Sequence, residues 1–286
     1  MNLLKIDATA EPLLSNAVLG VIWGAVFAGV LSVAGCSAPV VAAEPLRFNQ
    51  PLILLGEVHD NAAQHALRLR AFEALLAGGA RPTLALEQFD REYQPAIDRA
   101  LTQTPPPDAD ALIAVAGGAV DGWQWEFYRP YIALALRYRL PISAANVSRA
   151  ELRGVMRDGL AASGFDAEVP EPLLQTLAQS IEASHCGVLN NATARRMALA
   201  QVARDQFMAR VVERHADRGV LLLAGNGHVR TDVGAPRWLS AATRARSEAV
   251  GVLEAGDPTT AFDRLVFTPA QPRPDPCEAF RPAGKL

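Results

Sequence analysis

Short, almost wholly apolar runs that end abruptly in glycine or polar residues recur along this chain, with helical patterns between them. Such runs predict strands that are buried on both faces, since a half-exposed strand would alternate apolar and polar residues. Strands that alternate with helices form a mostly parallel sheet. The sequence therefore predicts an α/β fold with a mostly parallel central sheet flanked by helices, its strands lying at 51–55, 83–86, 140–145, 220–224 and 249–253.

Two of the connections between these strands are too long for a single crossover helix. One covers residues 90–139, and the other joins the third strand to the fourth. Both contain several amphipathic patterns. We expect helical insertions there that form a cap. The first helix is expected to start at Asn61, which has a capping-box relation to Gln64, and to stop at Gly78.

The N-terminal region has the pattern of an export signal. Residues 17–33 are apolar and uncharged, with a length between a signal peptide and a membrane span. Small residues precede Cys36, as in bacterial lipoprotein signals, so that Cys36 would become an acylated first residue. Cleavage after Ala43 would instead release the protein without an anchor, and no cleavage would leave a membrane anchor. All three readings predict export, and the favoured one is a lipid anchor on the periplasmic side of the outer membrane.

The rest of the chain is expected to hold one domain. Residues 1–45 are the signal or lipoprotein segment and linker, 46–268 the α/β domain, and 269–286 a proline-rich tail. A net charge of −3 with 20% charged residues gives no polyelectrolyte character, so nucleic acid is not an expected partner. An oxidising compartment permits Cys186 and Cys277 to pair, and a free buried thiol is the alternative.

Polar residues follow three of the expected strands, where ligands bind in open parallel sheets. Gly-x-x-His occurs twice, each time directly after a buried strand, and glycine would let the chain turn so that the histidine points back over the strand end. We therefore expect two histidines and two glutamates to converge on one site. The segments are Gly56–His59, Glu87–Gln88 and Gly225–His228.

The expected set of Glu57, His59, Glu87 and His228 permits two kinds of chemistry. Imidazoles and carboxylates together can hold a divalent metal. Without a metal they can act as general acid and base, with pKa values separated by their mutual charge. A single carboxylate after a strand is usually a helix cap or a solvated loop residue, so the hypothesis depends on the conjunction of the four.

Several neighbouring residues could support this site or could simply belong to the core. His65 lies on the apolar stripe of the first helix, where a hydrogen-bonded core histidine is the plainer interpretation. Gln201 and Asp205 share a helical stripe with apolar residues, so they either orient site histidines or bind backbone groups. An aromatic run packs a helix or forms a wall for a flat ligand; it comprises Trp123, Trp125, Phe127, Tyr128 and Tyr131.

Six sequence blocks between Leu52 and Leu253 together resemble the ChaN-like haem-binding uptake proteins of the Tiki superfamily. In order they are LLGEVHDNAAQH, LALEQFDRE, WQWEFYRPY, SHCGVL, AQVARDQFMA and GNGHVRTDVGAPRWL. The resemblance implies an iron-regulated, outer-membrane-associated lipoprotein that binds haem, with a possible homodimer holding two haem groups between its subunits. Other branches of the superfamily include metal-dependent peptidases with Gly-x-x-His signatures.

The resemblance also implies site residues. It maps the polar site of the superfamily onto Glu57, His59, Glu87, His185 and His228, with Asn226 and Arg230 beside the last. It implies a tyrosine ligand to the haem iron, for which Tyr128 and Tyr131 are predicted here, since phenolate is a known axial ligand. Cations for the haem propionates would come from Arg129, Arg137 or Arg230.

Three functions compete on this basis. The first is a haem-binding uptake module, in which the haem would be exchangeable because the chain has no Cys-x-x-Cys-His attachment sequence. The second is a metal-dependent hydrolase, either a peptidase or an esterase. In that hydrolase His59, His228 and a carboxylate would hold the metal while the other glutamate activates water. The third is a periplasmic binding or scaffold protein whose cluster is structural.

Overall fold

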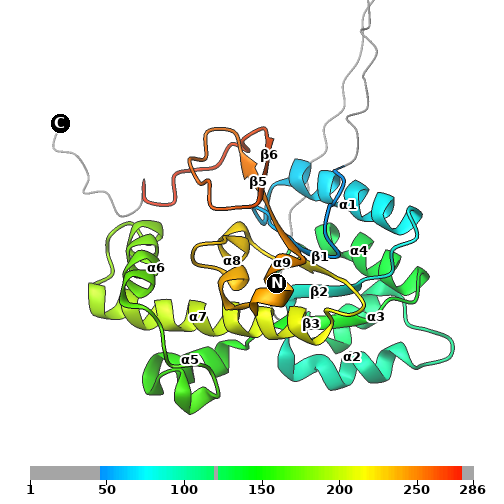
Figure 1. Cartoon of the computed structure of the whole chain (residues 1–286), viewed down its shortest axis with the longest axis horizontal. Helices are drawn as coiled ribbons and strands as arrows, with labels where there is room; N and C mark the ends of the chain where they lie inside the picture. The colour runs from blue at the N-terminus through cyan, green and yellow to red at the C-terminus, as the bar shows by residue number, and fades with distance from the viewer. Residues whose placement is uncertain (1–45, 119–121, 279–286) are drawn as a thin grey trace, which may run out of the picture. The chain divides into compact units, whose positions relative to one another are not determined.

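A computed structural model describes residues 46–118 and 122–278. Within these residues, six parallel strands form one sheet in the order β3-β2-β4-β1-β5-β6 (Figure 1). This confirms the predicted α/β class and the five expected strands. The strands are β1 (Leu52–Leu55), β2 (Thr83–Asp90), β3 (Ile142–Asn146), β4 (Val220–Leu223), β5 (Ser247–Glu254) and β6 (Arg264–Thr268).

The sixth strand, β6, was not predicted. It pairs only with β5 at the edge of the sheet, and Phe267 within it is 53% exposed. An edge strand of this kind needs no continuous apolar run, so it lacks the signal that identifies the buried strands.

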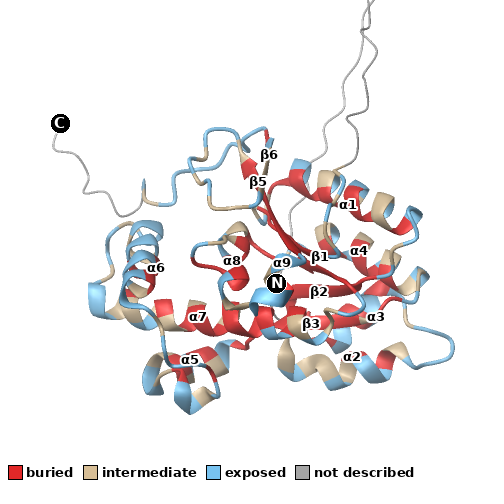
Figure 2. Cartoon of the chain, in the orientation of Figure 1, coloured by how far each residue is buried: buried red, intermediate tan, exposed pale blue. Residues whose placement is uncertain are grey.

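Alternate residues of each strand pack on opposite faces of the sheet, as the pleat requires. In β1, Leu52 and Leu54 belong to one hydrophobic core, and Ile53 and Leu55 belong to the other. Buried segments therefore line both sides of the strands (Figure 2). This explains why the strand sequences are apolar throughout.

The two long connections are helical, as predicted. The connection from β2 to β3 contains η1 (Arg91–Tyr93), α2 (Gln94–Leu101), α3 (Ala109–Val115) and α4 (Trp125–Arg137), which pack with α1 (Ala62–Ala77) on one face. The connection from β3 to β4 contains α5 (Arg149–Asp158), η2 (Ala161–Ser163), α6 (Glu171–Ser184) and α7 (Asn191–Arg214). Shorter helices follow β4, namely α8 (Asn226–Val229), η3 (Ala235–Trp238) and α9 (Ala241–Ala245).

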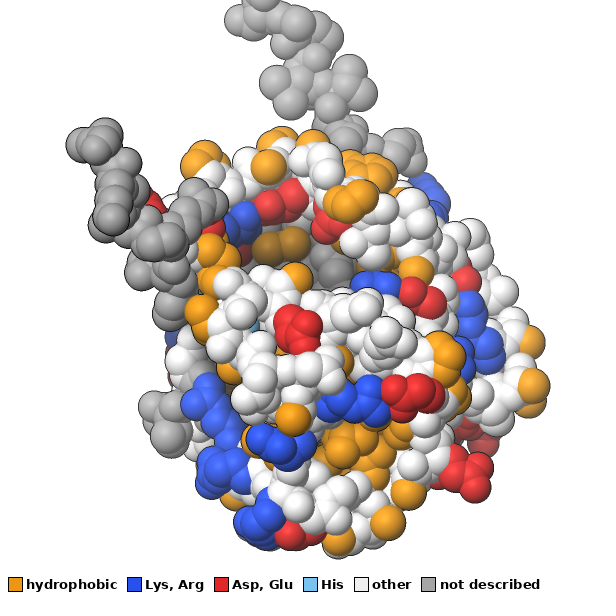
Figure 3. Space-filling view, turned by 90° about the vertical axis from the view of Figure 1, so that its left-hand side faces the viewer, with side chains coloured by type: hydrophobic (Ala, Val, Ile, Leu, Met, Phe, Trp, Pro, Cys, Tyr) orange, Lys and Arg blue, Asp and Glu red, His pale blue; other side chains and the backbone are white. Residues whose placement is uncertain are grey.

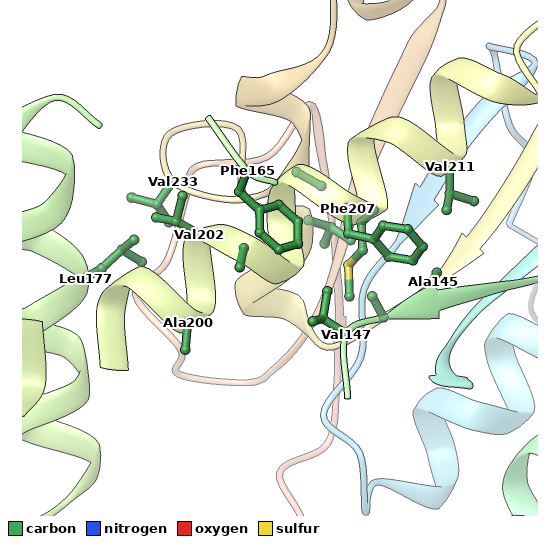
Figure 4. Packing of buried hydrophobic residues seen from close by; sticks show 14 of the residues in the cluster. Ala145, Val147, Phe165, Leu177, Ala200, Val202, Phe207, Val211 and Val233 are labelled. Atoms are coloured by element: carbon green, nitrogen blue, oxygen red, sulfur yellow. The ribbon is translucent and has the colours of Figure 1, made fainter. Parts of the chain in front are cut away.

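Helix α7 is the central element on its side of the sheet. Val202, Phe207 and Val211 from this helix pack with Ala145 and Val147 at the end of β3 (Figure 4). Helices α5 and α6 pack on α7 in turn. Because α7 lies between the sheet and these two helices, its polar side chains can face either the strand ends or the outer helices.

The start of α1 is fixed by the predicted cap. The side chain of Asn61 accepts from the backbone N–H of Gln64 at 3.1 Å, and the helix ends before Gly78. Asn61 also donates to Glu254 Oε1 at 2.6 Å. These bonds hold the loop between β1 and α1, which carries Glu57 and His59.

The segment that follows β6 is attached to the domain at two places. Cys186 and Cys277 form a disulfide with a Cα–Cα distance of 5.4 Å, which joins the loop between α6 and α7 to this segment. Arg273 pairs with Asp60 at 2.6 Å and with Glu254 at 2.8 Å. Of the two alternatives for these cysteines, the structure therefore shows the disulfide and not a free buried thiol.

None of the helices within 46–118 and 122–278 has the length and apolar character needed to cross a membrane. The predicted export segment at 17–33, the acylation site Cys36 and the cleavage site after Ala43 lie outside the described residues.

Candidate functional site

The strand order brings the three predicted polar turns to one edge of the sheet. Strand β4 lies between β1 and β2, and Leu223 is in register with both Leu55 and Leu86. The turns after these residues are therefore neighbours. The structure brings Glu57, His59, Glu87 and His228 together in two halves, which we call the strand-end cluster.

The first half is built around the carboxylate of Glu57, on the side of α1 and α4. Glu57 is 2% exposed, and it forms an ion pair with Arg68 of α1 and accepts a hydrogen bond from the hydroxyl of Tyr128 of α4. Arg68 is 0% exposed and also donates to the carbonyl of Leu55 at 3.2 Å. Burial lowers the pKa of Arg68, so the carboxylate is needed to stabilise its charge.

His59 is the accessible member of this half. Its Nδ1 lies 2.8 Å from Glu57 Oε1, and its side chain is 46% exposed. Burial lowers the pKa of His59 below its ordinary 6.5, so the neutral ring predominates at neutral pH. Because the carboxylate accepts from Nδ1–H, the neutral ring has its free lone pair on Nε2. The Trp123 ring meets the His59 ring edge-on at a centroid distance of 4.9 Å.

The second half lies on the side of α7 and is a buried histidine between two carboxylates. His228 Nδ1 is 2.6 Å from Asp205 Oδ1, and His228 Nε2 is 3.3 Å from Glu87 Oε1. Burial alone would lower the pKa of His228, but the two carboxylates raise it to about 10. The pKa of Glu87 is lowered to about 2, because the charge of His228 outweighs burial. His228 is therefore an imidazolium with both N–H groups engaged.

The two halves meet at Gly225. A Cβ on this glycine would lie 3.0 Å from His59 Nε2 and 3.7 Å from Glu87 Oε2. A Cβ on Gly56 would likewise overlap Asn226 Oδ1. The expected reason for these glycines was a sharp turn, but Gly225 has an ordinary φ of −59°. The observed reason is close approach of neighbouring side chains.

The other candidates near the cluster are structural supports. His65 Nε2 bonds to the carbonyl of His59 at 2.8 Å and its ring stacks on Phe127 at 4.3 Å. Asp205 holds the His228 ring by accepting from Nδ1–H, and the amide group of Gln201 packs beside the same ring, 3.0 Å from Nδ1. Asn226 accepts from the backbone N–H of Val252 and donates to its carbonyl.

His185, which the resemblance placed in the polar site, is not part of the strand-end cluster. It lies exposed at the C-terminal end of α6, with Nδ1 2.8 Å from the carbonyl of Ile181. The SHCGVL block therefore places His185 at the end of α6, away from the strand-end cluster.

The predicted divalent metal site is not supported. Among residues 46–118 and 122–278, no group of three or more His, Cys, Asp or Glu side chains is arranged to hold a metal ion. Each carboxylate of the cluster already has partners within the protein, Arg68 and Tyr128 for Glu57, and His228 and the Gly225 N–H for Glu87.

The predicted haem contacts of Tyr128, Tyr131 and Arg230 do not fit this structure. Both tyrosines are 0% exposed, and Tyr131 donates to the carbonyl of His65 at 2.9 Å. Burial raises the pKa of both phenols, to about 12 for Tyr131, so neither is poised to form a phenolate. Arg230 is held by both oxygens of Asp232, at 2.9 and 2.6 Å, and is not free for a propionate.

A second region lies between α5, α6 and α7, and we call it the α5–α7 groove. Its volume is about 470 Å³. Hydrophobic side chains and arginines are exposed together on this face (Figure 3). The apolar lining comprises Leu152, Met156, Ile181, Met197 and Ala200, and the polar lining includes Arg149, Arg153, Arg204 and His185.

A smaller crevice adjoins the groove and has a volume of about 250 Å³. Arg149 and Arg204 line both cavities. Within the described part of the chain, Arg149 and Arg153 make no ion pair, and Arg204 is 3.9 Å from Glu87 Oε1. Arg149 and Arg153 are therefore available to an incoming anion, and Arg204 is held only by a long contact with Glu87.

Arg68, Arg149 and Arg204 were missed by the sequence reasoning. Arg68 lies three residues after His65 and four before Phe72, on the face of α1 that is buried. That spacing was a usable signal. Arg149 and Arg204 come from separate helices, and no spacing in the sequence relates them.

The molecule is therefore an α/β protein with a parallel sheet, and an acid and imidazole cluster lies at the carboxyl edge of that sheet, where open parallel sheets generally bind ligands. A cationic apolar groove lies beside the cluster. The chain belongs to the family of haem-binding uptake proteins of the Tiki superfamily that includes ChaN, whose family model matches residues 48–239.

One solved structure supports this fold, and a more distant one was also found. ChaN of Campylobacter jejuni, solved with cofacial haem binding, is 23% identical with a TM-score of 0.61, covering 71% of this chain and 81% of that chain. A mutant of the erythromycin esterase EreC is 14% identical with a TM-score of 0.44, covering 72% and 71%. The latter is too distant to support an argument. No curated protein matches the chain.

Proposed function

We propose that this protein binds haem in the α5–α7 groove. The observation that carries the proposal is the pairing of an apolar lining with three arginines, two of them without an ion-pair partner in the described chain. Haem has a flat apolar ring and two anionic propionates, so the groove offers both contacts that it requires. Membership of the haem-binding uptake family supports the same ligand.

The iron ligand in this proposal is His185. None of the four tyrosines of the chain lines the groove, whereas the imidazole of His185 does. Its Nδ1 is engaged by the carbonyl of Ile181, which leaves Nε2 as the donor for iron. Met156 and Met197 line the same groove and offer thioether sulfur as a second ligand.

Haemin titration tests this proposal. The wild-type protein should give a Soret band that saturates at one haem per chain, and Leu152→Asp should weaken binding by placing a carboxylate in the apolar lining. His185→Ala should shift the band and alter the electron paramagnetic resonance spectrum of the ferric form. An unaltered spectrum in His185→Ala, with His59→Ala as the matched control, would remove His185 as the ligand.

The finer role is that of an exported lipoprotein in haem or iron uptake. The small residues before Cys36 and the apolar segment at 17–33 support it. Labelling with a palmitate analogue should mark the wild type and not Cys36→Ala, and the labelled protein should fractionate with the outer membrane. Sedimentation with and without haemin tests the homodimer.

A second candidate function is hydrolysis at the strand-end cluster, and it is favoured by the Glu57–His59 pair. A half-exposed imidazole whose Nδ1 is fixed by a buried carboxylate is oriented as a general base. A haem carrier does not require such a pair. The assay is hydrolysis of ester and peptide substrates, which should be lost in His59→Ala and retained in His185→Ala.

A further inference from the structure

The smaller crevice opens between the ends of β2 and β3, the start of α5 and the side of α7. Its lining includes Trp123, Asn146, Arg149 and Arg204, together with Asp90. Asp90 and Asn146 are in register at the ends of their strands. Since Trp123 also contacts the His59 ring, the crevice lies beside the accessible imidazole of the strand-end cluster.

The charges of the crevice favour an anion. Arg149 has no ion-pair partner among the described residues, and the side chain of Arg204 is 26% exposed with Glu87 as its nearest carboxylate at 3.9 Å. Asp90 is the acidic residue of the lining, and it has interactions of its own. Two guanidinium groups on one small cavity match the two oxygens of a carboxylate.

Asn146 adds a requirement for a hydrogen-bond donor. This residue is 7% exposed, and its Oδ1 is buried without a hydrogen-bond partner in the described structure. A buried acceptor without a partner destabilises the folded state, so such an atom calls for an explanation. An N–H group of a ligand in the crevice would satisfy it.

We propose that the crevice binds a small amide that carries a carboxylate. Arg149 and Arg204 hold the carboxylate, Asn146 Oδ1 accepts from the amide N–H, and Trp123 packs against the acyl group. The crevice is a different cavity from the α5–α7 groove, but the two share Arg149 and Arg204, so its ligand is expected to compete with haem.

The position of the amide carbonyl beside His59 rests on the hydrolase proposed as the second candidate function. In that reaction the oxygen of water bonds to the carbonyl carbon while His59 Nε2 takes a proton from the water. The C–N bond then breaks, and the same proton passes to the departing nitrogen. The products are a carboxylic acid and an amine.

Isothermal titration with N-benzoylglycine tests the crevice, because this probe has a carboxylate, one amide N–H and a flat acyl group. Wild type and His59→Ala should both bind it. Arg149→Ala and Arg204→Lys should each weaken binding about tenfold or more, since one loses a charge and the other loses the fork geometry. Arg153→Ala is the matched control, because Arg153 lines the groove but not the crevice.

A second probe and two substitutions of Asn146 identify the contacts on which binding depends. The methyl ester of N-benzoylglycine lacks the charge and should bind at least tenfold more weakly. Asn146→Asp should weaken the binding of N-benzoylglycine, because the new carboxylate repels the carboxylate of the probe. Asn146→Ala should also weaken this binding, because the acceptor Oδ1 is lost, but it should leave the affinity for inorganic phosphate unchanged. Circular dichroism confirms that each variant is folded.

The outcomes separate the two proposals. Binding that depends on Arg149, Arg204 and Asn146 without release of benzoate supports the crevice and overturns the placement of the amide carbonyl for attack beside His59. Equal affinity for phosphate and N-benzoylglycine, or an affinity unchanged in Arg149→Ala and Arg204→Lys, overturns the crevice as an amide site.

Discussion

The strand-end cluster and the α5–α7 groove use charge in opposite ways, although α7 forms a wall of both. In the cluster, Arg68 and His228 are buried against carboxylates of the protein. In the groove, Arg149 and Arg153 have no such partners within the described residues and lie beside apolar side chains. The difference indicates that the cluster is preorganised by its own contacts, whereas the arginines of the groove are left for the ligand proposed above.

Helix α7 joins the two regions through three nearby residues. Asp205 faces the cluster and holds His228, while Gln201 and Arg204 line the groove and also reach His228 and Glu87. A ligand that displaces Arg204 would therefore change the charge around Glu87. Substitutions that remove a charge from the strand-end cluster, compared with substitutions in the groove, test whether the two regions differ in this way.

The largest effect is expected from Arg68→Met, which leaves the buried carboxylate of Glu57 without its counter-charge. Loss of one partner of a buried ion pair costs about 3–5 kcal/mol of unfolding free energy. Arg70→Met on the same helix is the control, since Arg70 is exposed and should change stability by about 0.5 kcal/mol or less. Urea unfolding measures both. Equal values for the two variants would contradict the role given to Arg68.

The pH dependence of stability should report on His228. Its folded pKa of about 10 is above the ordinary 6.5, so the stabilisation is complete below pH 6.5 and is lost as the pH rises through 10. The unfolding free energy should fall over this range by up to about 1.4 kcal/mol per pH unit. Asp205, whose burial raises its pKa to about 6, has already titrated at the start of this window.

His228→Gln supplies the comparison for that experiment. The variant lacks the titrating ring, so its unfolding free energy should be nearly independent of pH between 7 and 10. Urea titrations at several pH values give the slopes. A wild-type slope no steeper than that of His228→Gln would show that the ring is not held as an imidazolium.

A smaller loss is expected from Gly225→Ala, where the two halves of the cluster meet. The new Cβ would lie 3.0 Å from the His59 ring, which must shift, at a cost of about 1–3 kcal/mol. Gly227→Ala is the matched control, because a Cβ there meets nothing within 4 Å. The His59 ring resonances in an NMR spectrum should move only in Gly225→Ala. Movement in both variants would argue against close approach as the cause.

The sequence predicted the fold and the cluster well because both depend on local patterns. A buried parallel strand is apolar on both faces, and its carboxyl end is marked by the polar residue that follows, as at Glu57 and Glu87. The Gly-x-x-His segments were correctly associated, although the glycines serve close packing. Helical spacing separates Arg68 from Arg70, since only Arg68 shares the buried face of His65 and Phe72. Its pairing with Glu57 is visible only in the tertiary structure.

The groove could not be predicted because its residues are far apart in the chain and have no shared pattern. Arg149 and Arg153 look like the solvated face of an amphipathic helix, and His185 looks like a helix end. The tyrosine ligand stays a prediction that the geometry of this structure does not favour, for a related reason. Tyr128 and Tyr131 lie on an aromatic helix that could face a ligand or the core, and packing against α1 decided for the core.

The smallest effect is expected where the groove and the crevice overlap. Arg153→Ala should lower the affinity for haem by about threefold, because an exposed ion pair with a propionate contributes up to about 1 kcal/mol. The same variant should leave the affinity for N-benzoylglycine unchanged. Saturating haem should lower that affinity, because haem would occupy Arg149 and Arg204. Titration of N-benzoylglycine with and without haem measures this competition. If the two ligands bind independently, haem does not reach the shared arginines, and its position in the groove must lie closer to α6.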